Sequence, residues 1–280
     1  LEYWMPVDWY NGGMEHVTRH LIYSRFWHKF LYDIGEVPTN EPYLKRSAQG
    51  LILGEDGEKM SKSKGNVVDP NDVVDSFGAD VLRVYILFMG DYGMAAPWSD
   101  SSVKGCKRFL DKVADLFDMA KGTGVTPKLE SAMHKTIKKV SQDIEDMKFN
   151  TAIAAMMTLV NTICEEKTLT VDELKTFVRL LCPFAPHLCE EMWANLGGEG
   201  LCSLAEWPTY DESKTIDSTV EVVVQINGKL RAKLMVAKDI SKDDAIAAAK
   251  ADEKIAVEIA GKTVIKEIYV PGKIVNLVVK

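Results

Sequence analysis

Three lysines and two serines crowd into the segment Lys59–Gly65, whose sequence is Lys-Met-Ser-Lys-Ser-Lys-Gly. Mobile ammonium groups, small hydroxyls and free backbone N–H groups at a helix start are the groups that bind a polyphosphate. A solvated Lys/Ser loop or a localisation signal has the same composition, and composition alone favours the solvated loop. The segment therefore predicts a polyphosphate site only if the rest of the chain supports one.

A second cluster follows two glycines, Gly12 and Gly13, which allow the backbone to approach a ligand closely. Apolar residues at helical spacing predict a helix over residues 14–32, and its N-terminus would lie at the same point. Glu15 and His16 would then be placed to contact an amino group or an adenosine. A glycine turn before a helix with surface histidines explains the same residues, so both interpretations stay open.

Neither the histidines nor the cysteines indicate a metal site. His16 and His20 have the spacing of a metal-binding pair, but no third ligand is evident and Glu15 precedes the first histidine. The five cysteines are Cys106, Cys164, Cys182, Cys189 and Cys202. None belongs to a Cys-x-x-Cys pair, so we expect buried free thiols in a reducing cytoplasm and no zinc.

A third polar group lies near the C-terminus, where cations alternate with apolar residues. These cations are Lys229, Arg231 and Lys233. A two-residue Asn-Gly turn, pairing Ile226 with Lys229, would place them on the apolar face. We therefore expect a three-residue loop, 226–228, that pairs Gln225 with Lys229 and leaves the three cations on one polar face. That face would either contact a nucleic-acid backbone or keep an exposed edge strand from pairing with other chains and aggregating.

The elements around these groups predict a mixed fold. Residues 1–98 have an α/β pattern, with a strand at 50–53, a turn at 54–57, and a helix begun by Asp69 and Pro70. A second helix should follow Gly78, with Asp80 as its cap. Its buried positions are Val81, Val84, Tyr85 and Phe88.

The remainder predicts a helical domain and a small α/β module. Residues 99–212 contain about five helices, the last three at 150–165, 171–181 and 186–196. Residues 218–280 fit a β-β-α-β-β module, with the polar stretch 211–218 as a linker. The expected domains are thus 1–98, 99–212 and 218–280.

Composition limits the function classes. Hydrophobic residues make up 46% and charged residues 27% of the 280, as in a soluble globular protein. The net charge of −7 argues mildly against general nucleic-acid binding, although residues 218–280 carry more cations than carboxylates. No apolar run is long enough to span a bilayer. The first residue is Leu1 and no signal-peptide pattern follows it, so we expect that the sequence begins at a cut inside a longer protein.

The phosphate-binding interpretation gains support from a family resemblance. Lys59–Ser63 is identified as the signature pentad of class I aminoacyl-tRNA synthetases, and Gly65–Pro70 with Phe77–Arg83 resembles the branch for branched-chain amino acids and methionine. Trp4–His16 and His20–Lys29 resemble the leucyl family. The resemblance implies that Lys59, Met60, Ser61, Lys62 and Ser63 bind ATP with Mg²⁺. Lys59 and Lys62 would hold the triphosphate, with Lys62 the stronger candidate for transition-state charge.

The same resemblance assigns the other clusters. It implies a Rossmann-type catalytic part in which Gly12, Gly13, Glu15 and His16 line the leucyl-adenylate pocket. It also implies an anticodon-binding bundle, matched at 149–157, 182–193 and 207–208, in which Lys104, Lys107 and Arg108 are candidate tRNA contacts. The segments 224–233 and 269–279 resemble the bacterial C-terminal module, so Lys229, Arg231 and Lys233 would bind tRNA(Leu).

The His-x-Gly-His signature of the family does not occur in the sequence, nor does an editing domain. We therefore expect part of a leucine–tRNA ligase that is inactive alone and needs an N-terminal catalytic part, in cis or as a separate subunit. The alternative is a non-catalytic tRNA-binding protein, or a separate subunit, derived from the synthetase.

Overall fold

Parallel strands organise the N-terminal part of the molecule in the computed structural model, which describes residues 1–215 and 219–280. Strand β1 (Val7–Asn11) pairs with β2 (Tyr43–Ser47), and helix α1 (His20–Asp33) connects them. The helix predicted from residue 14 begins six residues later, because Met14–His16 form only a 3₁₀ turn and Arg19 has a non-helical backbone at φ −130° and ψ −94°.

A second parallel pair frames the signature loop. Strand β3 (Ile52–Leu53) pairs with β4 (Ala96–Pro97), and helices α2 (Pro70–Phe77) and α3 (Ala79–Phe88) lie between them in the chain. The predicted start of α2 is confirmed, since the Asp69 side chain accepts a hydrogen bond from the N–H of Asn71 and Pro70 is the first helical residue. Gly50 lies against the carbonyl of Met94, a contact that leaves no room for a β-carbon.

The role predicted for Asp80 as the cap of α3 is wrong. Its carboxylate instead accepts hydrogen bonds from the backbone of Leu188 at 2.7 Å and from the His187 Nδ1 at 2.8 Å, in the first turn of α8 (Pro186–Asn195). Arg83, one turn along α3, donates to the carbonyls of Pro183 and Phe184. Helix α3 is thus joined to α8 by groups about a hundred residues apart in the chain.

Replacing Asp80 with Ala should lower the free energy of unfolding by about 1–3 kcal/mol, because the N–H of Leu188 and the Nδ1 of His187 lose a buried, charged acceptor. All six tryptophans lie before residue 210, so their fluorescence during urea unfolding follows the unit that contains Asp80. Asp75→Ala, at an exposed position on α2, is the matched control and should leave the midpoint nearly unchanged. Equal midpoints for both variants would contradict this role.

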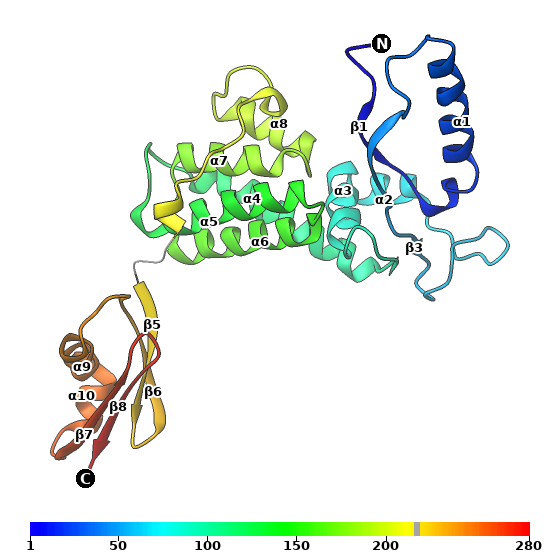
Figure 1. Ribbon diagram of the computed structural model, residues 1–280. Helices are drawn as coiled ribbons and strands as arrows, with labels where there is room; N and C mark the ends of the chain where they lie inside the picture. The colour runs from blue at the N-terminus through cyan, green and yellow to red at the C-terminus, as the bar shows by residue number, and fades with distance from the viewer. Residues whose placement is uncertain (216–218) are drawn as a thin grey trace. The chain divides into compact units, whose positions relative to one another are not determined.

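Five helices follow in the order expected. They are α4 (Asp100–Met119), α5 (Pro127–Glu145), α6 (Phe149–Glu166), α7 (Val171–Leu181) and α8. Figure 1 shows them gathered into one bundle. The predicted bounds of the last three are within a residue or two of those observed, because their caps are local: Thr170 and Glu173 form a complete capping box at α7.

Four of the five cysteines are buried in this bundle, as predicted for small apolar thiols, and Cys164 is half-buried. Burial raises the pKa of the Cys106 thiol to about 11 and that of Cys202 to about 12. Thiolates at these positions are therefore scarce at neutral pH. Across the described ranges, no helix has the length and apolarity needed to cross a lipid bilayer.

The chain divides into two compact units, Leu1–Tyr210 and Asp211–Lys280. The predicted boundary at residue 98 stays a prediction, and the predicted linker at 211–218 lies partly outside the described residues. The second unit contains β5 (Thr219–Ile226), β6 (Lys229–Ala237), α9 (Lys242–Ala251), α10 (Glu253–Ile259), β7 (Val264–Val270) and β8 (Ile274–Val279).

Its sheet has the strand order β6-β5-β8-β7, with α9 and α10 packed on one face (Figure 1). The module is therefore β-β-α-α-β-β, and the prediction of a single helix is wrong. Asp252 has an extended backbone that ends α9, and its side chain caps α10 through the N–H groups of Lys254 and Ile255. The break is a local cap signal.

Candidate functional site

Asn66 organises the loop that carries the signature lysines. Its side-chain oxygen accepts a hydrogen bond from the N–H of Ser61 at 2.9 Å, while its amide nitrogen donates to the carboxylate of Asp56 at 3.1 Å. The N–H groups of Lys64 and Gly65 return to the carbonyl of Ser61, and Gly65 has a positive φ of 69°. This turn fixes the backbone while leaving its lysine side chains exposed.

The three lysines of the loop differ in their partners. Lys64 forms an ion pair with Glu58 at 3.1 Å. Lys59 and Lys62 are exposed and have no ion pair with any described residue. Two ammonium groups are therefore available to an incoming anion, and they are the two to which the family resemblance assigns the triphosphate. Ser61 and Ser63 place their hydroxyls 2.8 Å apart beside them, and Met60 is half-buried against the core.

The glycine cluster lies at the carboxyl ends of β1 and β2. Asn11 is paired with Ser47, and the N–H of Gly12 donates to the Ser47 carbonyl at 3.2 Å. The carboxyl edge of parallel strands is where such sheets bind ligands. Arg46, which sequence reasoning missed, donates from Nη2 to the carbonyls of both Gly12 and Gly13, at 3.3 and 3.1 Å. It holds the turn in shape.

Glu15 and His16 lie on the 3₁₀ turn that follows, with Oε1 of Glu15 and Nε2 of His16 3.7 Å apart and both side chains exposed. The expected α-helix N-terminus at this point is absent, because α1 begins only at His20. Among the described residues, no hydrogen bond or ion pair joins this cluster to the signature loop. The structure brings Gly12, Gly13, Glu15 and His16 together as one group, and Lys59–Ser63 as another.

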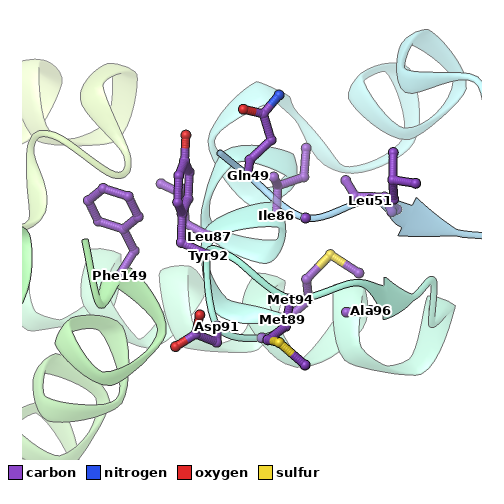
Figure 2. Close-up of a pocket in the computed structure, with 13 residues that line it drawn as sticks. Gln49, Leu51, Ile86, Leu87, Met89, Asp91, Tyr92, Met94, Ala96 and Phe149 are labelled. Atoms are coloured by element: carbon purple, nitrogen blue, oxygen red, sulfur yellow. The ribbon is translucent and has the colours of Figure 1, made fainter. Parts of the chain in front are cut away.

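An apolar cavity of about 180 Å³ lies beside β3. Figure 2 shows Leu51, Met94 and Ala96 along one part of it and Phe149, at the start of α6, facing Tyr92. Asp91 is its one charged lining residue. A cavity with this lining does not suit a triphosphate, so the candidate phosphate site is the exposed loop.

The C-terminal cations do not share one face as predicted. Ile226 pairs with Lys229 through a two-residue Asn227-Gly228 turn. The strand register then shifts between Val224 and Gln225, so that Arg231 has no partner residue on β5. This β-bulge restores the apolar pairing that the rejected turn otherwise disrupts. The three-residue loop is therefore wrong.

Each cation consequently has different surroundings. Lys229 lies opposite the core residue Ile226, and no described residue forms an ion pair with it. Arg231 forms an ion pair with Glu258 of α10 at 2.9 Å. Lys233 pairs with Glu221 at 2.9 Å. Among the three cations, Lys229 is the one that could bind an anion without first breaking an ion pair with a described residue.

Two family descriptions match the chain. Residues 5–99 match "tRNA synthetases class I (I, L, M and V)", and residues 128–246 match "Anticodon-binding domain of tRNA ligase". The first span includes both the glycine cluster and the signature loop. The second includes α5–α8 and extends into the C-terminal unit.

Relatives match over the whole chain. It is 53% identical over 281 residues to a leucine–tRNA ligase of Alkaliphilus oremlandii (strain OhILAs), covering 100% of this chain and 35% of the relative. It is 49% identical over 285 residues to a leucine–tRNA ligase of Bdellovibrio bacteriovorus, covering 100% and 36%. The chain thus spans about a third of the length of these relatives.

Two solved structures of aminoacyl-tRNA synthetases are also similar to the chain. A ternary complex of Agrobacterium radiobacter K84 agnB2 LeuRS with tRNA and LeuAMS has a TM-score of 0.69 and 35% identity, over 98% of this chain and 38% of that one. A Mycobacterium tuberculosis methionyl-tRNA synthetase bound to methionyl-adenylate has a TM-score of 0.54 at 19% identity, over 70% of this chain and 45% of that one. The latter shares the fold alone.

Proposed function

Because the chain is homologous over its whole length to the C-terminal part of leucine–tRNA ligases, we propose that it forms part of such a ligase. The complete enzyme would activate leucine with ATP to leucyl-adenylate and transfer the leucyl group to tRNA(Leu). This chain would supply the second ATP signature loop and the tRNA-binding domains. The whole-chain identity of 53% is the observation that carries the proposal.

In the activation step the leucine carboxylate attacks the α-phosphorus of ATP and pyrophosphate leaves. Lys59 and Lys62 would stabilise the charge that develops on the phosphate oxygens, since neither is neutralised by a described residue. Mg²⁺ would arrive with the triphosphate as part of the substrate. No protein nucleophile takes part.

The glycine cluster would form one wall of the adenylate pocket. Arg46 holds the Gly12-Gly13 turn through its carbonyls, which leaves Glu15 and His16 exposed beside it. A carboxylate suits the amino group of leucine, and an imidazole suits a hydrogen bond to adenosine.

A covering partner for this region is supported by α1. The side chains of Phe26 and Tyr23 are 74% and 72% exposed, and only Leu21 and His28 of this helix are buried. Contiguous exposed aromatics of this kind mark an interaction surface. We propose that the N-terminal catalytic part of the ligase, in cis or as a separate subunit, covers it. The free cysteines are in keeping with a cytoplasmic location.

The proposal is tested by joining this chain to the N-terminal part of the Alkaliphilus ligase. ATP–pyrophosphate exchange should then depend on leucine, with isoleucine, valine and methionine as competitors. Leucine-independent exchange, or an equal response to another of these amino acids, would contradict the assignment.

For the C-terminal module, Lys229→Gln should weaken binding of tRNA(Leu) and of a tRNA of another specificity by the same factor. A phosphate contact carries no sequence information. It should also flatten the slope of log affinity against log salt by about one unit. Lys233→Gln, whose ammonium is already paired with Glu221, is the matched control and should change the slope less. Identical slopes for both variants would leave only a solubility role for Lys229.

A further inference from the structure

The four cations of α4 differ in what surrounds them. Lys107 is held by Asp111, with its Nζ 2.7 Å from Oδ2. Arg108 and Lys112 are exposed and have no ion pair within the described part of the chain. They are four residues apart, so their side chains form one row with a spacing of about 6 Å along the helix axis. Lys104 extends this row by one turn.

A groove of about 320 Å³ lies between α4 and α6 beside the row. It is lined by Gly105, Arg108, Phe109, Lys112, Met157, Val160 and Asn161. None of these residues is acidic, and Asp115, one turn beyond Lys112, does not line the groove. The α4–α6 groove is therefore locally positive on a chain whose net charge is −7.

The two cations converge on this groove from different positions. A guanidinium nitrogen of Arg108 lies 3.8 Å from the point where a β-carbon on Gly105 would stand, so the glycine leaves space above the helix beside it. The Lys112 ammonium donates to the Asn161 side chain of α6 at 3.3 Å, which directs it across the groove. Beneath them, Phe109 and Val160 are buried and form an apolar floor.

We infer that the α4–α6 groove binds a phosphate of an RNA backbone, with Arg108 and Lys112 supplying the charge and Asn161 orienting Lys112. The inference rests on the proposed function, because tRNA binding identifies which polyanion reaches this surface. A guanidinium offers a fork of donors and an ammonium a mobile point charge, and together they suit the oxygens of one phosphate. Such a contact positions the RNA without reading its sequence.

The test measures binding of the whole chain to a tRNA(Leu) transcript over a series of salt concentrations. The double variant Arg108→Gln with Lys112→Gln should flatten the slope of log affinity against log salt by about one unit, the value for one phosphate contact. Relative to the unchanged chain, the double variant should lose more affinity at low salt than at high salt. Lys107→Gln, on the same helix, removes an expected tRNA contact that Asp111 already neutralises, so it should flatten the slope by much less than the double variant.

The outcomes separate the two proposals. If the unchanged chain binds tRNA(Leu) and the double variant keeps its slope, the inference that the groove binds a phosphate is wrong and the proposed function stands. If the unchanged chain does not bind tRNA(Leu), both are overturned. Equal flattening by the Lys107 variant would show a diffuse charge effect and would also contradict the inference that the groove binds a phosphate. Matching helical circular dichroism and unfolding midpoints should accompany each variant, since all three positions lie on the surface.

Discussion

Replacing Lys62 with Ala in an active ligase that contains this chain should lower the rate of leucyl-adenylate formation about 10²–10³-fold, the range for one preorganised donor to developing charge. Lys62 lies in the turn Ser61–Gly65, whose backbone is held by hydrogen bonds to Ser61 and by Asn66. The backbone is thus fixed while the ammonium stays exposed, with no ion-pair partner among the described residues, as a group reserved for a substrate would be.

The affinity for leucine should change little, because the loop offers cations and hydroxyls rather than a pocket for an aliphatic side chain. Pre-steady-state measurement of adenylate formation, at several concentrations of leucine and ATP, separates rate from binding. A weaker affinity for leucine with an unchanged rate would show that Lys62 has been assigned the wrong role.

Lys64→Ala is the matched control within the same loop. Lys64 is also an exposed lysine, but Glu58 neutralises it at 3.1 Å. Since an exposed ion pair contributes only about 0–1 kcal/mol, its loss should cost less than about tenfold in rate. A loss equal to that of Lys62→Ala would mean that the loop acts through its summed charge rather than through particular residues.

The parts of the fold that sequence predicted well are those set by neighbours in the chain. Asp69 and Pro70 begin α2, and Thr170 begins α7, because caps involve residues within one turn. Asp252, the N-cap of α10, carries the same kind of local signal, but the predicted β-β-α-β-β module has only one helix and so omits α10.

The errors involve partners distant in sequence or a local irregularity. Asp80 bonds to α8 more than a hundred residues away, and no pattern around it indicates that partner. Arg46 is likewise defined by its contact with Gly12 and Gly13 on another strand. In the hairpin, the bulge at Arg231 keeps Val224 opposite Ala232 even with a two-residue turn, and the alternation of polar and apolar residues does not indicate this irregularity.

For the candidate site, sequence provided the residues and structure provided their ion-pair partners. The pentad contains Lys59 and Lys62, and Lys64 follows it, but the sequence does not indicate that Lys64 is paired with Glu58. The same distinction separates Lys107 from Arg108 on α4 and Lys229 from Lys233 on β6. The roles of these residues in catalysis and in tRNA binding stay predictions.

The 280-residue chain by itself should not catalyse leucine-dependent ATP–pyrophosphate exchange above a no-protein control. Its signature loop provides two ammonium groups that no described residue pairs with and that are open to water, where their interaction with a developing charge is strongly screened. Catalysis by charge stabilisation requires donors held in place around the phosphate on more than one side. Among the described residues, no hydrogen bond or ion pair connects the loop to the glycine cluster.

The assay should use the Alkaliphilus ligase as the positive control, so that a negative result reflects the chain and not the conditions. Adding a separately produced N-terminal part of that ligase should restore exchange if the two parts associate through the exposed face of α1. That face can be tested in the same mixture, because Phe26→Ser removes a side chain that is 74% exposed and therefore not required for folding. Restoration that survives this substitution would place the contact elsewhere, and exchange by the chain alone would show that its own residues complete the ATP site.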